Sequence, residues 1–267
     1  MPAPPASSAL PSTAAWRAWL DRQPALLLIF TTLVWGSNVV AARLAVGHVS
    51  PMMLTTARWS VACIALWLVA RRPVAAAWPQ LRPRWRYLTA MGVAGFTGFN
   101  ALYYTAAHHT SAVNLAIIQG VVPVLVLLGA ALALRLRVGA LQALGVLLTL
   151  AGVVVVASRG QWSVLRALDL NVGDLGVLLA CVLYAGYTLG LRAKPAVSPL
   201  AFFAVVAAVA ALASLPLLAW EVAAGDFFWP TPRGWWIILY VGLLPSFVSQ
   251  ITYIRAVELI GPARAGV

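Results

Sequence analysis

Charged residues are scarce in this sequence, and that scarcity limits the kind of protein it can be. Only 9% of the 267 residues are charged and 63% are hydrophobic, whereas a typical soluble domain carries about 25% charged residues. The mean hydropathy is +0.92. Such a chain cannot expose its surface to water, so a soluble globular domain is excluded. We predict an all-α membrane protein that resides in a lipid bilayer.

Acidic residues are particularly rare, with six Asp and Glu against 18 Lys and Arg and a formal net charge of +12. Nucleic acid is not the expected partner, because the basic residues lie in short clusters between apolar runs, where membrane topology explains them. The acids fall in loops or at the ends of the predicted spans, so none is placed to relay protons at mid-membrane. They are Asp21, Asp169, Asp174, Glu221, Asp226 and Glu258.

The sequence also lacks the motifs of common enzymes and metal-binding proteins. It contains no HExxH, GxSxG, P-loop or GxGxxG pattern, and the adjacent His108 and His109 have no neighbouring ligands. The two cysteines, Cys63 and Cys181, each lie inside an apolar run, which favours a role as small hydrophobic side chains. We therefore expect no catalysis, no metal site and no cofactor.

Apolar runs long enough to cross a membrane are what the sequence does contain. A spanning helix needs about 20 mostly apolar residues, and eight candidates cover residues 25–46, 52–70, 87–107, 111–134, 138–157, 175–191, 200–220 and 235–254. A ninth candidate begins near Pro262 and is cut off. Residues 1–22 are predicted to be a disordered cytoplasmic tail, because they start with a segment rich in Pro, Ala and Ser without a secretory signal pattern.

A weak internal repeat connects the two parts of the chain. Residues 85–117 align with residues 235–267 at an offset of 150, which pairs Trp85 with Trp235, Gly92 with Gly242, Asn100 with Gln250, Tyr103 with Tyr253 and Ala106 with Ala256. A Ser-Pro pair precedes each copy, at residues 50–51 and 198–199. We predict a five-helix repeat at 23–158 and a second one at 171–267, truncated in its ninth helix.

The distribution of basic residues predicts the orientation. With the N-terminus in the cytoplasm, the inner segments hold 13 of the 18 basic residues, namely Arg17, Arg22, Arg71, Arg72, Arg82, Arg84, Arg86, Arg135, Arg137, Arg192, Lys194, Arg255 and Arg264. Because five spans per half is an odd number, the halves must enter the membrane in opposite senses. The expected fold is an inverted repeat of ten helices, of which this chain represents about nine, with a binding site between the halves.

Polar and aromatic residues inside the spans are the candidates for that site. Thr97, Asn100, Tyr104 and His108 share one face of the third span, and similar faces occur on the sixth and eighth spans. Such residues either line a cavity or join helices, and both readings stay open for each residue. The predicted substrate-binding residues are Asn38, Arg58, Asn100, Tyr103, Tyr104, Gln119, Tyr184, Tyr187, Gln250 and Tyr253.

Arg58 is a charged residue placed within the second predicted span. It follows Pro51 by seven residues, which puts it about 10 Å from the start of its helix. We expect the side chain to snorkel to the outer surface, because no acid in the spans is available to pair with it. The alternative is that Arg58 meets a carboxylate of the substrate.

Several segments resemble one known family. They are TLVWGSNVVAARLAV at 32–46, SPMMLTTARW at 50–59, YYTAAHHTSAVNLAIIQGVVPVLVLL at 103–128 and GDLGVLLACVLYAGYTL from Gly173. They are similar to EamA-type carriers of the drug/metabolite transporter superfamily, and the nearest analogy is to YddG-type exporters of aromatic amino acids. The resemblance implies ten helices, cytoplasmic termini, inverted halves, a central cavity and efflux across a bacterial inner membrane. Members often carry a glutamate where Leu134 precedes Arg135, so any role of that acid is absent here.

The function predicted from these features is export of small organic solutes, above all amino acids including aromatic ones, by alternating access. Within the same superfamily, the alternatives are a drug or quaternary-cation exporter and a nucleotide or sugar transporter. Outside transport, the alternatives are a membrane scaffold and an intramembrane enzyme. Because the spans lack carboxylates, we expect exchange or a uniport-like step rather than proton coupling.

Overall fold

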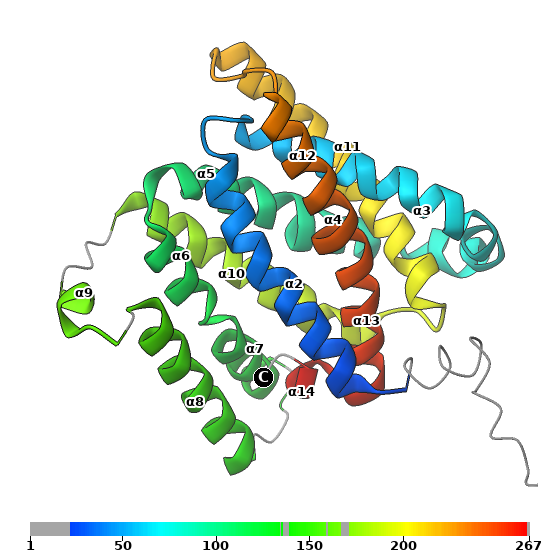
Figure 1. The fold of residues 1–267 in the computed structure, drawn as a ribbon. Coiled ribbons are helices and arrows are strands. Elements are labelled where there is room, and N and C mark those ends of the chain that lie inside the picture. Colours follow the sequence, from blue (N-terminus) through cyan, green and yellow to red (C-terminus); the bar gives the residue numbers. More distant parts are fainter. Residues whose placement is uncertain (1–21, 134, 136–138, 159, 167–170, 266–267) are drawn as a thin grey trace, which may run out of the picture.

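A computed structural model describes residues 22–133, 135, 139–158, 160–166 and 171–265, and every regular element in these ranges is a helix (Figure 1). The predicted all-α class is therefore confirmed. The tail predicted for residues 1–22 lies, except for Arg22, outside the described residues. The helices are α2 (Pro24–Ala45), α3 (Pro51–Leu81), η1 (Arg82–Arg84), α4 (Trp85–Gly92), η2 (Val93–Gly98), α5 (Phe99–His109), α6 (Ala112–Gln119), α7 (Val122–Leu132), α8 (Ala140–Ala157), α9 (Trp162–Arg166), α10 (Val172–Gly190), η3 (Leu191–Ala193), α11 (Pro199–Ala224), α12 (Pro232–Val241), η4 (Gly242–Val248), α13 (Ser249–Ile260) and α14 (Pro262–Ala265).

Six helical stretches in the described ranges are long and apolar enough to cross a membrane. One of them, Pro51–His109, is a continuous run of 59 residues. A straight helix of this length would measure about 88 Å at 1.5 Å per residue, far more than the roughly 30 Å of a bilayer core. It contains the second and third predicted spans, and α3 packs against α5, so the chain folds back within this run. The fifth predicted span corresponds to a shorter apolar helix, Ala140–Val156.

The second span was predicted to end at residue 70, where its apolar run ends, but the helix that contains it continues past this residue. Helix α3 continues for 11 further residues, through Arg71, Arg72 and Pro73 to Leu81. The prediction followed the end of the apolar run, but the arginines end only the hydrophobic segment and not the backbone hydrogen bonding. Arginine is a good helix former, so the helix extends beyond the lipid-facing part of the chain.

The fourth predicted span is divided into two helices. Helix α6 ends at Gln119, and α7 begins at Val122 with Pro123 at its second position. Proline is tolerated there because the first turn of a helix has no intrahelical partner for that N–H. Pro123 therefore starts a new helix, and the break lies beside the central cavity described below.

Two π-helical segments were not predicted, and they occupy places that correspond at a sequence offset of 150. Segment η2 interrupts the third span at Val93–Gly98, and η4 interrupts the eighth at Gly242–Val248. At the offset of 150, residues 93–98 correspond to 243–248, so the two insertions coincide almost residue for residue. A π segment inserts one residue per turn and is frequent at functional sites.

The helix contacts also correspond between the two parts of the chain, because helices of each part pack on helices of the other. Helix α4 packs on α11 and segment η4 packs on α3, while α5 packs on α10 and α13 packs on α2. Helices α3 and α11, which both start at a Ser-Pro pair, pack on each other. Each part therefore supplies the same kinds of element to a shared interior.

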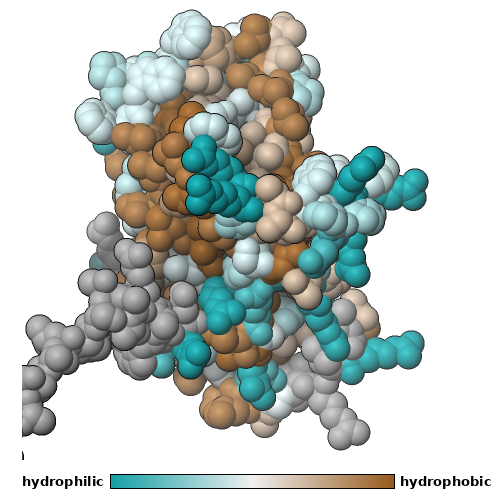
Figure 2. All heavy atoms as spheres, turned by 90° about the vertical axis from the view of Figure 1, so that its right-hand side faces the viewer, coloured by the Kyte–Doolittle hydropathy of each residue, from teal (hydrophilic) through white to brown (hydrophobic). Residues whose placement is uncertain are grey.

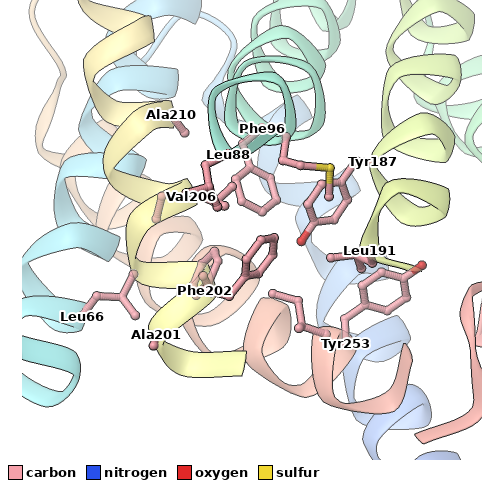
Figure 3. Close-up of a cluster of buried hydrophobic side chains, with 14 of the residues drawn as sticks. Leu66, Leu88, Phe96, Tyr187, Leu191, Ala201, Phe202, Val206, Ala210 and Tyr253 are labelled. Atoms are coloured by element: carbon pink, nitrogen blue, oxygen red, sulfur yellow. The ribbon is translucent and has the colours of Figure 1, made fainter. Parts of the chain in front are cut away.

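The apolar side chains divide between this interior and the outer surface. One buried cluster joins α3, α4, α10, α11 and α13, and Figure 3 shows Phe96 and Tyr187 close together within it. Figure 2 shows broad hydrophobic areas on one side of the molecule, with hydrophilic side chains gathered in patches. Exposed Leu, Ile, Val and Trp side chains on most helices are what a lipid-facing surface requires.

Candidate functional site

A cavity of about 860 Å³ lies in the interior, and its walls come from both parts of the chain. The wall residues of α2 run from Leu28 to Leu44, a distance of about 24 Å along the helix axis. Seven of the ten predicted binding residues line it, namely Asn38, Arg58, Asn100, Gln119, Tyr184, Gln250 and Tyr253. Tyr103, Tyr104 and Tyr187 are not among the lining residues; they are buried behind the wall.

Arg58 does not snorkel, contrary to the prediction. Its side chain is 4% exposed and points into the interior, where three hydrogen bonds hold it. Nε donates to Ser246 Oγ at 2.8 Å, and Nη1 donates to Asn100 Oδ1 at 2.5 Å and to the Tyr104 hydroxyl. The partners come from α5 and η4, so the side chain gains more from these bonds than from reaching the outer surface.

The positive charge of Arg58 has no carboxylate partner in the described part of the chain. The ion pairs found there involve only Glu258, with Lys194 and Arg255. The remaining terminal nitrogen of Arg58, Nη2, forms no hydrogen bond with a described residue. Arg58 lines the cavity and is the buried charged residue among the described lining residues.

The two buried carboxylates are occupied at helix ends, away from the cavity wall. Glu221 accepts hydrogen bonds from Ser50 Oγ at 2.6 Å and from the backbone N–H groups of Met52 and Met53. Asp174 accepts from Asn114 Nδ2 at 2.8 Å and from the Thr110 hydroxyl. Both acids were predicted at span ends, but their burial was not foreseen.

Aromatic rings form one side of the cavity. The ring centroid of Trp35 lies 4.9 Å from that of Tyr253 and 5.4 Å from that of Tyr184, and Phe99 lies 5.2 Å from Tyr184. All four residues line the cavity. Trp35 is held in place because its Nε1 donates to Ser249 Oγ at 2.8 Å. These edge and tilted contacts are favourable for aromatic pairs, and they leave room for a further ring.

Three polar atoms of cavity-lining residues are buried without a hydrogen-bond partner in the described chain, namely Trp59 Nε1, the Tyr184 hydroxyl and Gln250 Oε1. Such atoms are uncommon in folded proteins, because an unsatisfied buried polar group costs about 1–3 kcal/mol. The indole N–H and the hydroxyl can donate, and the amide oxygen can accept. The wall thus contains polar atoms whose hydrogen-bonding capacity the described residues do not use.

The other predicted residues have mostly structural contacts. Tyr103 donates to Gln119 Oε1 at 3.1 Å, and Tyr104 donates to Asn38 Oδ1 at 3.4 Å. The Tyr187 ring packs on Phe96, with no partner for its hydroxyl among the described residues. His108 is exposed at the end of α5, so it does not continue the polar face of that helix into the cavity.

Sequence analysis missed the apolar part of the wall. Trp59, Phe96 and Phe99 line the cavity, and the ring centroids of Trp59 and Phe96 are stacked 4.5 Å apart. The helical spacing of Phe96 and Phe99 beside Asn100 was an available signal. The predicted binding residues were polar residues and tyrosines, so this apolar signal was not included.

A bundle of membrane-length helices around a solute-sized cavity, with polar and aromatic groups converging on it, defines a membrane transporter. The sequence pattern of the EamA-like transporter family matches residues 23–158 and 171–267, and the chain belongs to that family.

One relative agrees with this assignment, and one solved structure shares the fold. The protein "Uncharacterized transporter YyaM" of Bacillus subtilis (strain 168) is 26% identical over 229 residues, which are 79% of this chain and 75% of the relative. One crystal structure shares the fold with a TM-score of 0.65 at 18% identity, over 90% of this chain and 84% of the other. The predicted family is confirmed.

Proposed function

We propose that this transporter exports small solutes that carry a carboxylate, above all amino acids including aromatic ones. The observation that carries the proposal is Arg58, a buried guanidinium that faces the cavity without an acidic partner among the described residues. Neutral hydrogen-bond acceptors solvate such a charge but do not neutralise it. A solute carboxylate at Nη2 would do both through a charge-assisted hydrogen bond.

The rest of the cavity suits an aromatic amino acid. The rings of Trp35, Tyr184 and Tyr253 offer edge and face contacts to a solute ring. Gln250 Oε1 can accept a hydrogen bond from the solute ammonium group. In this arrangement, the predicted substrate-binding residues Asn38, Asn100 and Tyr104 act by holding Arg58 and its neighbours in position.

The same residue argues against the cation-export alternative. An aromatic surface could attract a quaternary ammonium ion, but a buried guanidinium in the same cavity would repel it, and no acid of the described chain lines the wall. A zwitterion or an anion is therefore the better match. Nucleosides, which lack a carboxylate, serve as a discriminating comparison.

Transport would proceed by alternating access between two inverted five-helix repeats, residues 23–158 and 171–267, of a ten-helix protein. The coincident π segments and the reciprocal helix contacts support the repeat. The excess of arginine in the segments assigned to the inside supports a cytoplasmic N-terminus, and hence export across a bacterial inner membrane. The binding site would then lie near the midplane, where both repeats meet.

The experiment that tests this proposal is counterflow in proteoliposomes. The purified protein is reconstituted, and a panel of amino acids, amines and nucleosides is tested for exchange against preloaded solute. We expect amino acids, and aromatic ones most, to exchange, with no accompanying proton flux because no described acid lines the cavity. Exchange of amines or nucleosides in preference to amino acids would contradict the proposal.

A further inference from the structure

A second hollow lies on the outside of the bundle, where α3 ends and α4 begins beside α11. Its volume is about 710 Å³. Its floor is apolar and consists of Leu81, Leu88, Val205 and Val209, which belong to α3, α4 and α11. The exposed side chains of Trp78, Trp85 and Arg82 form its rim. We call this hollow the α3–α4–α11 groove.

The chain segment that borders the α3–α4–α11 groove is basic and contains no acidic residue. Five arginines occur between residues 71 and 86 with no acid among them. Arg71, Arg72, Arg82 and Arg86 are exposed, and none of them forms an ion pair with a described residue. Arg84 is engaged by a hydrogen bond from Nη1 to the Ala193 carbonyl oxygen at 3.0 Å. The groove therefore complements a negatively charged ligand.

The surroundings of the groove place it at the level of lipid headgroups. Trp67, Trp78 and Trp85 are all exposed, and tryptophan is enriched where a membrane protein crosses from hydrocarbon to headgroups. The Arg86 guanidinium lies 5.4 Å from the Trp85 ring centroid, which keeps this charge at the rim of the groove. An apolar floor below a basic aromatic rim matches a molecule with an acyl chain and an anionic headgroup.

We propose that the α3–α4–α11 groove binds one anionic phospholipid, such as phosphatidylglycerol. The headgroup phosphate contacts Arg82 and Arg86, and an acyl chain lies over Leu81, Leu88, Val205 and Val209. Basic pockets between membrane helices recognise lipid headgroups in this way. Because the floor joins α11 to α3 and α4, the bound lipid bridges helices from both parts of the chain. The site is separate from the central cavity and does not depend on the identity of the transported solute.

Native mass spectrometry of the purified full chain, titrated with phosphatidylglycerol or with phosphatidylcholine, tests this proposal. We expect preferential binding of phosphatidylglycerol, and a loss of affinity of about fivefold for each arginine removed in Arg82→Gln and in Arg82→Gln/Arg86→Gln. Arg233→Gln removes an exposed arginine in the first turn of α12 and is the matched control, expected to bind like the wild type. Equal binding of the two lipids by the wild type would overturn the proposal.

Two further arms separate a lipid from a free phosphate. Thr89→Trp introduces a bulky ring into the groove while keeping every arginine, because Thr89 is exposed and lines the hollow. We expect it to weaken phosphatidylglycerol binding as much as the arginine substitutions do, with an unchanged melting temperature of the lipid-free protein. Glycerol phosphate is expected not to compete. Competition by glycerol phosphate, or undiminished lipid binding by Thr89→Trp, would refute an acyl chain in the groove.

Discussion

The third and eighth spans share a π segment and a hydrogen bond to Arg58, but their corresponding polar residues differ in hydrogen bonding. Each contains a π segment at the equivalent place, and each contributes a hydrogen-bond acceptor to Arg58, Asn100 from α5 and Ser246 from η4. Asn100 is fully engaged, since its Nδ2 also donates to the Phe96 carbonyl oxygen at 2.6 Å. Gln250, its counterpart at the offset of 150, keeps Oε1 without a partner in the described chain. Both spans therefore hold the arginine, and the eighth also contains an acceptor that no described residue uses.

The two Ser-Pro helix starts differ in a comparable way. Ser198 caps its own helix by accepting a hydrogen bond from the Ala201 N–H at 3.1 Å. Ser50 instead donates to Glu221 of α11, and Glu221 takes over the cap of α3. The first start depends on a residue from the other part of the chain, so it couples the two parts, whereas the second start is self-contained.

The largest expected effect on stability comes from removing the shared cap. Glu221→Ala would leave Ser50 Oγ and two backbone N–H groups unsatisfied in a buried site, at a cost of about 3 kcal/mol or more. Ser198→Ala removes one exposed-side cap and should cost only about 1 kcal/mol. Thermal unfolding in detergent checks both. Equal losses for the two variants would show that the Ser-Pro starts are equivalent after all.

Asn100→Ala and Gln250→Ala compare the two polar counterparts directly. Asn100→Ala removes an acceptor from the buried guanidinium, so we expect a loss of about 1.5–3 kcal/mol in stability together with reduced transport. Gln250→Ala removes an atom that has no partner in the described chain, so stability should be unchanged while the apparent KM for solute rises. The pair is measured by thermal unfolding and by counterflow on the same preparations. A destabilised Gln250→Ala with normal KM would contradict the assigned difference.

Gly92 and Gly242, which correspond at the offset of 150, test whether the two spans pack in the same way. A Cβ at Gly92 would lie 2.7 Å from Val209, and one at Gly242 would lie 2.7 Å from Val61. We expect Gly92→Ala and Gly242→Ala to destabilise the protein by a similar amount, about 1–2 kcal/mol, because the added methyl group would overpack each helix contact. Gly186→Ala is the control, since nothing lies within 4 Å of its added Cβ.

Periodicity and length were enough to predict most helices, and the resemblance of several segments predicted the family. The polar and aromatic residues within the spans predicted seven residues that line the cavity. They could not predict the π segments, because one inserted residue hardly changes the pattern of apolar side chains. The burial of Arg58 in the interior could not be predicted either. Its partners Asn100 and Ser246 lie 42 and 188 positions away in the sequence, so only the assembled bundle reveals that burial is compensated. The α3–α4–α11 groove likewise forms only where α11 packs beside α3 and α4, so the sequence could not reveal it.

The account rests on Arg58 as the group that receives a solute carboxylate, and one comparison tests this most directly. Counterflow of phenylalanine and of phenethylamine, which lacks only the carboxylate, is measured for the wild type, Arg58→Lys and Arg58→Ala. We predict that the wild type prefers phenylalanine by about tenfold or more, that Arg58→Lys keeps part of this preference, and that Arg58→Ala abolishes it. An unchanged preference in a folded Arg58→Ala protein would contradict the account.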